Sequence, residues 1–442
     1  MKTDLKNIIF LLIVVLSVPI SIYLLSQKTS FFQKASGENA NLLIDASNML
    51  GGKSESWRNL AQGGEERGRQ LAPVIDKVRD LRPKYIRIDH VFDYYTEAEL
   101  DQVINDITAT GAKPFISLSY MPPKIAKDGN ITNLPVDWQE WENLVQKTVE
   151  HISGKRGLNV TDVYYEVWNE PDLFGKFSIN GQKSYLDLYR HSANAISRSK
   201  SVNNYKIGGP ATTGFYENWL TKLVSYTSEY NIRLDFLSWH RYSKDLAVYE
   251  TDLNNALHYN KELIITELGP NSENDPVYDG NFGAIHLIAT SALMEGKIDK
   301  IFNFEIKDGQ GKDKYWGRWG IITHEKWGVP EIKPRYRAIQ FLNNLIGGSN
   351  LQVDGQGSWV KVMAKRYEDN KIKILIVNYD KYGKHNEAVP LKVVNLPSNS
   401  FTLKRIDFNS DTTSVPITIE NNTWETLLSF EPNTASIFEM SF

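Results

Sequence analysis

The 442-residue chain contains no cysteine. Disulfide bonds, zinc sites built from thiolates and lipid attachment to an N-terminal cysteine are therefore excluded. The chain also lacks a basic run, a glycine-rich phosphate loop and zinc-ligand spacing, and its formal net charge is only −3. We therefore expect no nucleic-acid partner.

Aromatic residues are plentiful. They make up 12% of the chain, with 11 Trp and 22 Tyr. Aromatic rings fill protein cores, and they also stack on the C–H faces of sugars. Core filling accounts for most of them, so their number indicates a carbohydrate ligand only weakly.

One long apolar run lies near the N-terminus, at residues 8–25. Its length is at the short end of what a helix needs to cross a bilayer. Lys2 and Lys6 precede it, which places the N-terminus inside and the rest of the chain outside. A cleaved signal peptide is the alternative, but no small-x-small cleavage site directly follows the run. We favour residues 1–39 as a cytoplasmic tip, a membrane-spanning signal-anchor helix and a tether, with the rest of the protein extracytoplasmic.

Residues 40–348 alternate short apolar strands with amphipathic helices, which predicts a parallel sheet. Eight such units in about 300 residues fit one (β/α)₈ TIM barrel. A doubly wound open sheet would need a glycine-rich turn that opens a helix after its first strand, and Gly51-Gly52 does not match that fingerprint. The expected strands are residues 42–45, 85–89, 114–119, 163–167, 206–210, 234–240, 262–267 and 300–305.

Beyond residue 348 the helical period ends and short strands separated by turn residues follow. This pattern predicts a C-terminal antiparallel β-sandwich domain at residues 349–442. The expected strands are residues 359–364, 372–378, 391–394, 401–406 and 436–440. The domain could bind a glycan, but we favour a structural module that packs against the barrel. The sequence does not indicate an oligomeric state.

Polar side chains follow several of the expected barrel strands. The β-branched and aromatic segment 163–167 has the composition of a buried strand, and it ends in Asn169 and Glu170 before a proline stops the pairing. Segment 262–267 ends in Glu267. Because active sites of such barrels lie at the C-terminal ends of the strands, we expect these side chains to meet at one rim. Other polar residues at strand ends are Arg87, Asp89, His90, His240 and Tyr242.

Two carboxylates in a barrel mouth are what cleavage of a glycosidic bond requires. One must be protonated near neutral pH, and the other must stay ionised. Carboxyl groups about 5–5.5 Å apart would retain the configuration of the sugar, and groups about 6.5–9.5 Å apart would invert it. The sequence does not give the separation.

At these residues the chain resembles a known group. Trp168-Asn169-Glu170-Pro171 and Thr266-Glu267 are similar to the motifs of the clan A (β/α)₈ retaining glycoside hydrolases, and most similar to those of family 39, which includes β-xylosidases and α-L-iduronidases. The resemblance covers about residues 40–345. Its further support comes from segments 165–172, 208–211, 235–242, 319–322 and 333–338.

The resemblance implies a role for each residue at the rim. Glu170 would be the general acid/base and Glu267 the nucleophile. Asn169 would hydrogen-bond the 2-OH of the sugar, a contact that strengthens in the transition state. Tyr242 or His240 would hold the nucleophile ionised and oriented.

Residues 87–90 depart from the family pattern. Arg87 would support the carboxylates, although a purely structural pairing with Asp89 or Glu166 is the alternative. The xylosidase and iduronidase pattern has a histidine two residues after this arginine. Here Asp89 stands in that place, and His90 is one residue further on. The sugar contact would change from a neutral donor to an anion, so specificity for xylose or iduronate is in doubt.

Segment 303–308 lacks the tryptophan that often floors the sugar site, and Trp316 or Trp319 could replace it. We therefore predict a retaining glycoside hydrolase that acts on an extracellular or cell-envelope oligo- or polysaccharide, without a metal ion or organic cofactor. The alternatives are a non-catalytic glycan-binding surface protein and a transglycosylase with the same site. The sugar, its linkage and exo or endo action are not predicted.

Overall fold

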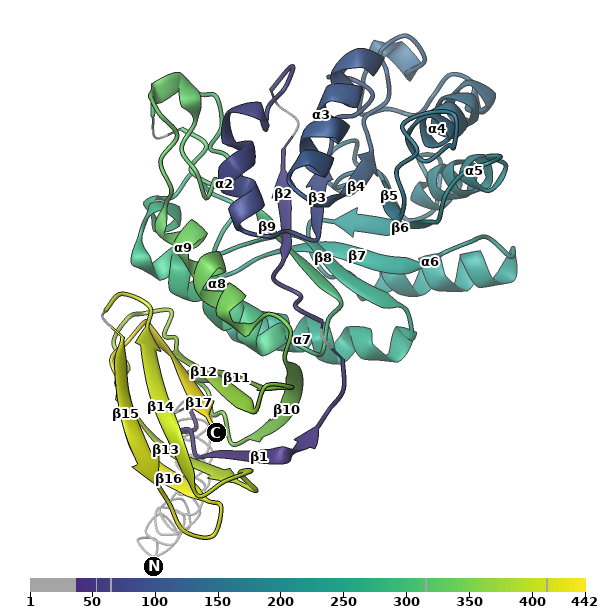
Figure 1. Cartoon of the computed structure of the whole chain (residues 1–442). Coiled ribbons are helices and arrows are strands. Elements are labelled where there is room, and N and C mark those ends of the chain that lie inside the picture. Colours follow the sequence, from purple (N-terminus) through teal and green to yellow (C-terminus); the bar gives the residue numbers. More distant parts are fainter. Residues whose placement is uncertain (1–36, 53, 64–65, 315, 411) are drawn as a thin grey trace, which may run out of the picture.

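The computed structural model describes residues 37–442 except residues 53, 64–65, 315 and 411 (Figure 1). The expected signal anchor at residues 8–25 and most of the tether lie outside the described residues. Within the part of the chain that is described, no helix is long and apolar enough to cross a membrane. The described chain forms a barrel ringed by helices, with a strand-rich second unit beside it.

The predicted (β/α)₈ barrel is confirmed, because its strands are parallel and close into a ring in chain order. Its strands are β2 (Asn59–Gln62), β3 (Tyr85–Ile88), β4 (Lys113–Leu118), β5 (Val163–Val167), β6 (Tyr205–Thr212), β7 (Phe236–Tyr242), β8 (Glu262–Gly269) and β9 (Lys300–Phe304). The interior is packed rather than hollow. The side chains that fill it are Ala61, Phe115, Tyr164, Phe236, Ile264 and Phe302.

Helices between the strands cover the outside of the barrel. They are α2 (Ile75–Asp80), α3 (Glu97–Ala109), α4 (Trp138–Ile152), α5 (Tyr185–Ser197), α6 (Glu217–Glu229), α7 (Leu246–Ala256), α8 (Asn281–Met294) and α9 (Pro334–Leu342). Side chains cap several of them: Thr96 and Glu99 form a capping box at α3, and Asp137 caps α4. Helix α8 is buried from Gly283 to Met294, because it lies between the barrel and the second unit.

The second unit is built on strands in the order β15-β14-β17-β12-β11-β10-β1-β13-β16. Their bounds are β1 (Leu42–Met49), β10 (Ser349–Asp354), β11 (Val360–Tyr367), β12 (Lys371–Asn378), β13 (Glu387–Val394), β14 (Ser400–Asp407), β15 (Thr413–Thr418), β16 (Trp424–Phe430) and β17 (Thr434–Ser441). Neighbouring strands are antiparallel except β1 and β13, which are parallel. These strands agree with the predicted sandwich.

The prediction that residues 42–45 form the first barrel strand is wrong. They belong to β1, which pairs with β10 and β13 in the second unit. Along β1, Leu42 and Ile44 are buried whereas Leu43 is 41% exposed. That alternation suits a strand with one buried face, whereas strands of an α/β barrel are buried on both faces, as β5 is. The barrel instead begins at β2.

The second unit packs firmly on the barrel. Met363, Leu375 and Val377 belong to the same hydrophobic core as the barrel and its helices. The neighbouring positions on β11 and β12 face the other way, into a separate core of the second unit. One sheet therefore serves two cores, and the unit is structurally continuous with the helix layer of the barrel.

Candidate active site

The end of β5 presents the first pair of site residues. Trp168 has φ +71° and Glu170 has φ +45°, a left-handed backbone that bulky residues rarely adopt. Trp168 is fully buried and its indole N–H donates to the backbone oxygen of Phe174 at 3.0 Å, which holds the turn in place. Such strain persists only where the surroundings enforce it, and it gathers at active sites. Asn169 and Glu170 both line the cavity described next.

A cavity of about 490 Å³ opens at the C-terminal ends of the barrel strands. Residues from seven strands or the loops after them, β2 to β5 and β7 to β9, reach it, as expected for this fold. Its described lining consists of Gln62, Gly63, Glu66, Asp89, His90, Tyr120, Asn169, Glu170, Leu173, Phe174, Tyr242, Glu267, Ser272, Phe304, Glu305, Asp308, Gly309, Gln310, Trp316 and Trp319.

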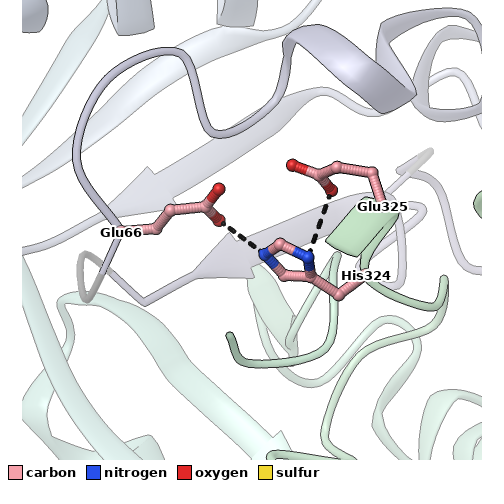
Figure 2. Close-up of side chains that lie close together, drawn as sticks. All are labelled: Glu66, His324 and Glu325. Atoms are coloured by element: carbon pink, nitrogen blue, oxygen red, sulfur yellow. Dashed lines mark hydrogen bonds and ion pairs between the residues drawn. The ribbon is translucent and has the colours of Figure 1, made fainter. Parts of the chain in front are cut away.

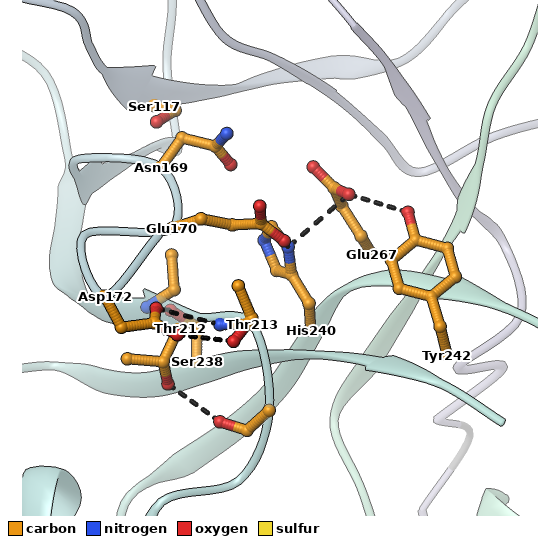
Figure 3. Close-up of polar contacts among 12 residues, drawn as sticks. Ser117, Asn169, Glu170, Asp172, Thr212, Thr213, Ser238, His240, Tyr242 and Glu267 are labelled. Carbon is orange, nitrogen blue, oxygen red and sulfur yellow. Dashed lines mark hydrogen bonds and ion pairs between the residues drawn. The ribbon is translucent and has the colours of Figure 1, made fainter. Parts of the chain in front are cut away.

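Glu170 and Glu267 face each other across this cavity (Figure 3). One carboxylate oxygen of each and a ring nitrogen of His240 lie within 4.8 Å of one another. His240 Nδ1 is 2.9 Å from Glu170 Oε1 and 3.4 Å from Glu267 Oε2. Burial opposes a charge on this ring, but the negative charges of Glu267 and Glu170 outweigh it and raise the pKa of His240 above its ordinary value.

An irregularity in β8 aims Glu267 at the cavity. The register with β7 shifts between Trp239 and His240, and the register with β9 shifts between Ile265 and Leu268. Ile264 lies in the barrel interior, so strict alternation would turn Glu267 toward the helices. The shift reverses the alternation, as an extra residue in a bulge does.

Glu267 accepts two hydrogen bonds from fixed donors. Arg87 Nη1 donates to Oε1 at 2.9 Å, and the hydroxyl of Tyr242 donates to Oε2 at 2.7 Å. Burial raises the pKa of the Glu267 carboxyl above its ordinary value, while the charges of His240 and Arg87 act against that rise. Burial and the charge of Glu267 raise the pKa of Tyr242 well above its ordinary value, so Tyr242 remains a donor.

Arg87 connects three site residues. Besides Glu267, its Nε donates to Glu166 Oε2 at 2.8 Å and its Nη2 donates to Asn169 Oδ1 at 2.7 Å. Asn169 Nδ2 in turn donates to the hydroxyl of Tyr120 at 2.8 Å. Because Arg87 binds the amide oxygen of Asn169, the amide nitrogen points away from Arg87, toward the hydroxyl of Tyr120. Arg87 therefore makes the structural pairing with Glu166 and also contacts the second carboxylate, Glu267.

All the site residues predicted from the sequence lie at or directly behind the cavity. Glu170, Glu267, Asn169, Asp89, His90, Tyr242, Trp316 and Trp319 line it, whereas Arg87 and His240 are buried and reach it through the glutamates. The prediction missed Gln62, Glu66, Tyr120 and Glu305. Glu305 directly follows the last barrel strand, so the same signal that identified Glu267, a carboxylate at a strand end, could have found it.

Two groups of side chains have metal-ligand chemistry in the described chain. The first is Glu170, His240 and Glu267; the second is Glu66, His324 and Glu325 (Figure 2). In the second group the ammonium of Lys307 lies 2.8 Å from Glu66 and 2.9 Å from Glu325. A buried lysine thus supplies the positive charge at this position, and the cluster joins the loop after β2 to the loop after β9.

Comparisons with known proteins agree with this geometry. The model of "Glycosyl hydrolases family 39" matches residues 85–284, which include Arg87, Glu170 and Glu267. A β-xylosidase of Caldicellulosiruptor saccharolyticus is 27% identical over 390 residues, which cover 80% of this chain and 76% of that protein. A β-xylosidase of Geobacillus stearothermophilus is 29% identical over 326 residues, 64% of this chain and 62% of that protein.

Solved structures show the same fold. A family 39 enzyme from Xanthomonas axonopodis pv. citri superposes with a TM-score of 0.72 at 17% identity, covering 91% of this chain and 97% of that one. A monomeric β-xylosidase from Caulobacter crescentus CB15 superposes with a TM-score of 0.71 at 19% identity, covering 91% of this chain and 99% of that one. The family match and the β-xylosidase relatives, on this shared fold, support a glycoside hydrolase of family 39, in clan A, and indicate that the protein is a glycosidase.

Proposed function

We propose that the protein hydrolyses a glycan by double displacement with retention of configuration, using Glu267 as nucleophile and Glu170 as acid/base. The observation that carries this proposal is the short separation of the two carboxylates, with one oxygen of each within 4.8 Å. Retaining enzymes hold their carboxyl groups about 5–5.5 Å apart, whereas inverting enzymes need about 6.5–9.5 Å to admit a water molecule.

In the first step the Glu267 carboxylate attacks the anomeric carbon, and the bond from that carbon to the glycosidic oxygen breaks. Glu170 gives its proton to the departing oxygen, so the leaving group departs as an alcohol and the sugar is esterified to Glu267. In the second step the Glu170 carboxylate takes a proton from water. The hydroxide attacks the anomeric carbon, the ester bond breaks, and Glu267 is released.

The neighbours of the two glutamates suit these roles. Arg87 and Tyr242 both donate to Glu267, which favours its ionised form. His240 contacts Glu170 at 2.9 Å and lies between the two carboxylates, where a proton is exchanged. Asn169 lines the cavity and is held by Arg87 through its amide oxygen, and its amide nitrogen, which also donates to Tyr120, would contact the 2-OH of the sugar.

The proposed substrate is a β-linked glycan, since the two relatives above are named β-xylosidases. As part of the same proposal, the reaction takes place outside the cytoplasm on an envelope or extracellular glycan. The support for this is the apolar run at residues 8–25 behind Lys2 and Lys6.

Azide rescue of two variants tests the roles. We expect Glu267→Ala to lose turnover of an aryl β-glycoside almost completely, and added azide to restore it and yield the α-glycosyl azide. Glu170→Ala should keep activity only on substrates with good leaving groups, and azide should then yield the β-glycosyl azide. NMR spectroscopy of the two products distinguishes them. Near-normal activity of Glu267→Ala, or the same azide anomer from both variants, would contradict the assignment.

A further inference from the structure

The cavity wall carries carboxylates besides the proposed catalytic pair. These are Glu66, Asp89, Glu305 and Asp308. No lysine or arginine is among the described residues that line the cavity. The cations of this region sit behind the wall instead: Arg87, Lys307, Lys333 and Arg335 are at most 6% exposed and do not line it.

Two of these carboxylates stand where the glycone, the sugar that forms the ester, would bind. Glu170 protonates the leaving group, so the leaving group lies on the β5 side of the cavity and the glycone on the side away from it. Strands β9, β2 and β3 are consecutive in the closed barrel, two or more strands from β5. Glu305 follows β9, the strand directly across the barrel from β5, and Asp89 follows β3, between β9 and β5 along the ring.

The side chain of Glu305 is held in a fixed position. Gln62 Nε2 donates to Glu305 Oε2 at 3.0 Å, and the backbone N–H of Gly63 donates to the same oxygen at 3.3 Å. The orientation of Gln62 is itself determined, because its Oε1 accepts the backbone N–H of Lys307 at 2.9 Å. The carboxylate is therefore a positioned acceptor on the cavity wall.

The backbone around Glu305 is fixed as well. Its N–H donates to the oxygen of Trp319 at 2.7 Å, and its oxygen accepts the N–H of Ile321 at 2.9 Å. The buried guanidinium of Arg335 donates to the backbone oxygens of Trp319 and Phe304 at 2.6 and 2.9 Å. Such support from a second layer is what holds a binding group to within a fraction of an ångström.

We propose that Glu305, together with Asp89, selects a glycone that carries no carboxylate and thereby excludes glycosides of uronic acids. This inference rests on the proposed function, because it takes the cavity as the place of hydrolysis. An ionised carboxylate accepts hydrogen bonds and donates none, which suits sugar hydroxyl groups. A uronate in the same place would set its carboxylate against Glu305 and Asp89 with no lining lysine or arginine described to pair with it.

A matched pair of substrates tests the proposal on the full-length protein. 4-Nitrophenyl β-glucoside and 4-nitrophenyl β-glucuronide differ only at carbon 6, where a hydroxymethyl group replaces the carboxylate. We expect the wild type to prefer the glucoside in kcat/KM by about tenfold or more, since like charges repel in a partly desolvated site. Glu305→Gln should reduce the preference, mostly through KM, and Glu305→Asp, which keeps the charge, should preserve it.

Calorimetric titration with methyl β-glucoside and methyl β-glucuronide measures the same preference without turnover. The control for surface charge is Glu331→Gln, which removes an exposed carboxylate in the loop after β9. A wild type that prefers the glucuronide, a preference unchanged in Glu305→Gln, or binding of neither sugar would overturn the proposal. Selective binding without hydrolysis would support it while contradicting the proposed function. Hydrolysis of both substrates without selectivity would support the proposed function and would overturn the proposal on selectivity.

Discussion

At the scale of single residues, the two central glutamates differ in the groups that hold them. Glu267 receives hydrogen bonds from Arg87 and Tyr242, a permanent cation and a hydroxyl whose pKa is raised. Glu170 contacts the ring of His240. Donors that cannot give up their protons favour an anion, which supports the proposal that Glu267 is the nucleophile.

Removal of the Tyr242 hydroxyl should weaken the nucleophile. A hydrogen bond to a charged group contributes about 1.5–3 kcal/mol, so we expect Tyr242→Phe to lower kcat/KM by roughly tenfold to a hundredfold. Tyr259→Phe is the matched control, because its hydroxyl bonds Thr221 on the surface. Equal activity of the two variants in a steady-state assay would argue against this role for Tyr242.

The same variant should change the pH dependence. In the proposed mechanism Glu267 must be ionised to attack, so activity should be lost as the pH falls through its pKa, which burial raises above the ordinary value. Tyr242 donates to the ionised form, and its loss raises this pKa further. The acid limb of the kcat/KM profile should therefore move to higher pH in Tyr242→Phe, whereas a purely structural effect would lower the whole profile without moving the limb.

The polar residues at the ends of the barrel strands could be predicted from the sequence, because cleavage of a glycosidic bond requires carboxylates at that rim. Asn169, Glu170 and Glu267 stand out in the sequence as polar residues that end apolar strands. Tyr120 and Gln62 could not be recognised in this way, because a tyrosine or glutamine near a strand end has many structural uses. Their positions follow from contacts with Asn169 and Glu305, which only the folded chain reveals.

At the scale of elements, β5 matches its predicted bounds whereas the first barrel strand was misplaced. β5 has five residues, all buried, and all but Glu166 are β-branched or aromatic. β2 has only four residues and buries two polar ones, Asn59 and Gln62, so it has no hydrophobic signal of its own. Segment 42–45 has a stronger apolar pattern but pairs with β10 and β13. Segment 42–45 lies in the second unit because its pairing partners are distant in the sequence, and the composition of a segment does not reveal its partners.

A buried ion pair joins the residue after α8 to the second unit, beside the shared hydrophobic core. Lys365 Nζ of β11 lies 2.7 Å from Glu295 Oε1, at 0% and 3% side-chain exposure. Glu295 also accepts the backbone N–H groups of Glu55 and Ser56. Lys365→Met would leave a buried carboxylate without its cation, so we expect unfolding in denaturant to become easier by about 3–5 kcal/mol.

The exposed pair of Lys392 and Glu425 gives the matched control, since Lys392→Met should cost about 1 kcal/mol or less. Burial raises the pKa of Glu295, but Lys365 and the hydrogen bonds outweigh it and lower the pKa below its ordinary value. The stabilisation by the pair is thus present at neutral pH and is lost as the pH falls through the carboxylate range. Lys365→Met should show a smaller loss of stability on acidification, and an unchanged pH dependence would contradict this account.

At the scale of the whole molecule, closure of the barrel brings together residues that are distant in the chain. Arg87 and Glu267 are separated by 180 positions and are joined by a hydrogen bond. The second unit takes strands from both ends of the described chain and covers α8, away from the cavity. Its structural part is therefore to brace the helix layer behind β8, the strand that presents Glu267.

The central claim is that Glu267 forms a covalent bond to the sugar. The direct measurement is mass spectrometry of the protein after incubation with an activated 2-deoxy-2-fluoro β-glycoside of a sugar that it cleaves, followed by digestion and peptide sequencing. We predict that one sugar is added per chain, that it is attached to Glu267, and that Glu267→Gln is not labelled. Turnover without a trapped adduct and with inverted product, or attachment of the sugar to Glu170, would contradict the account.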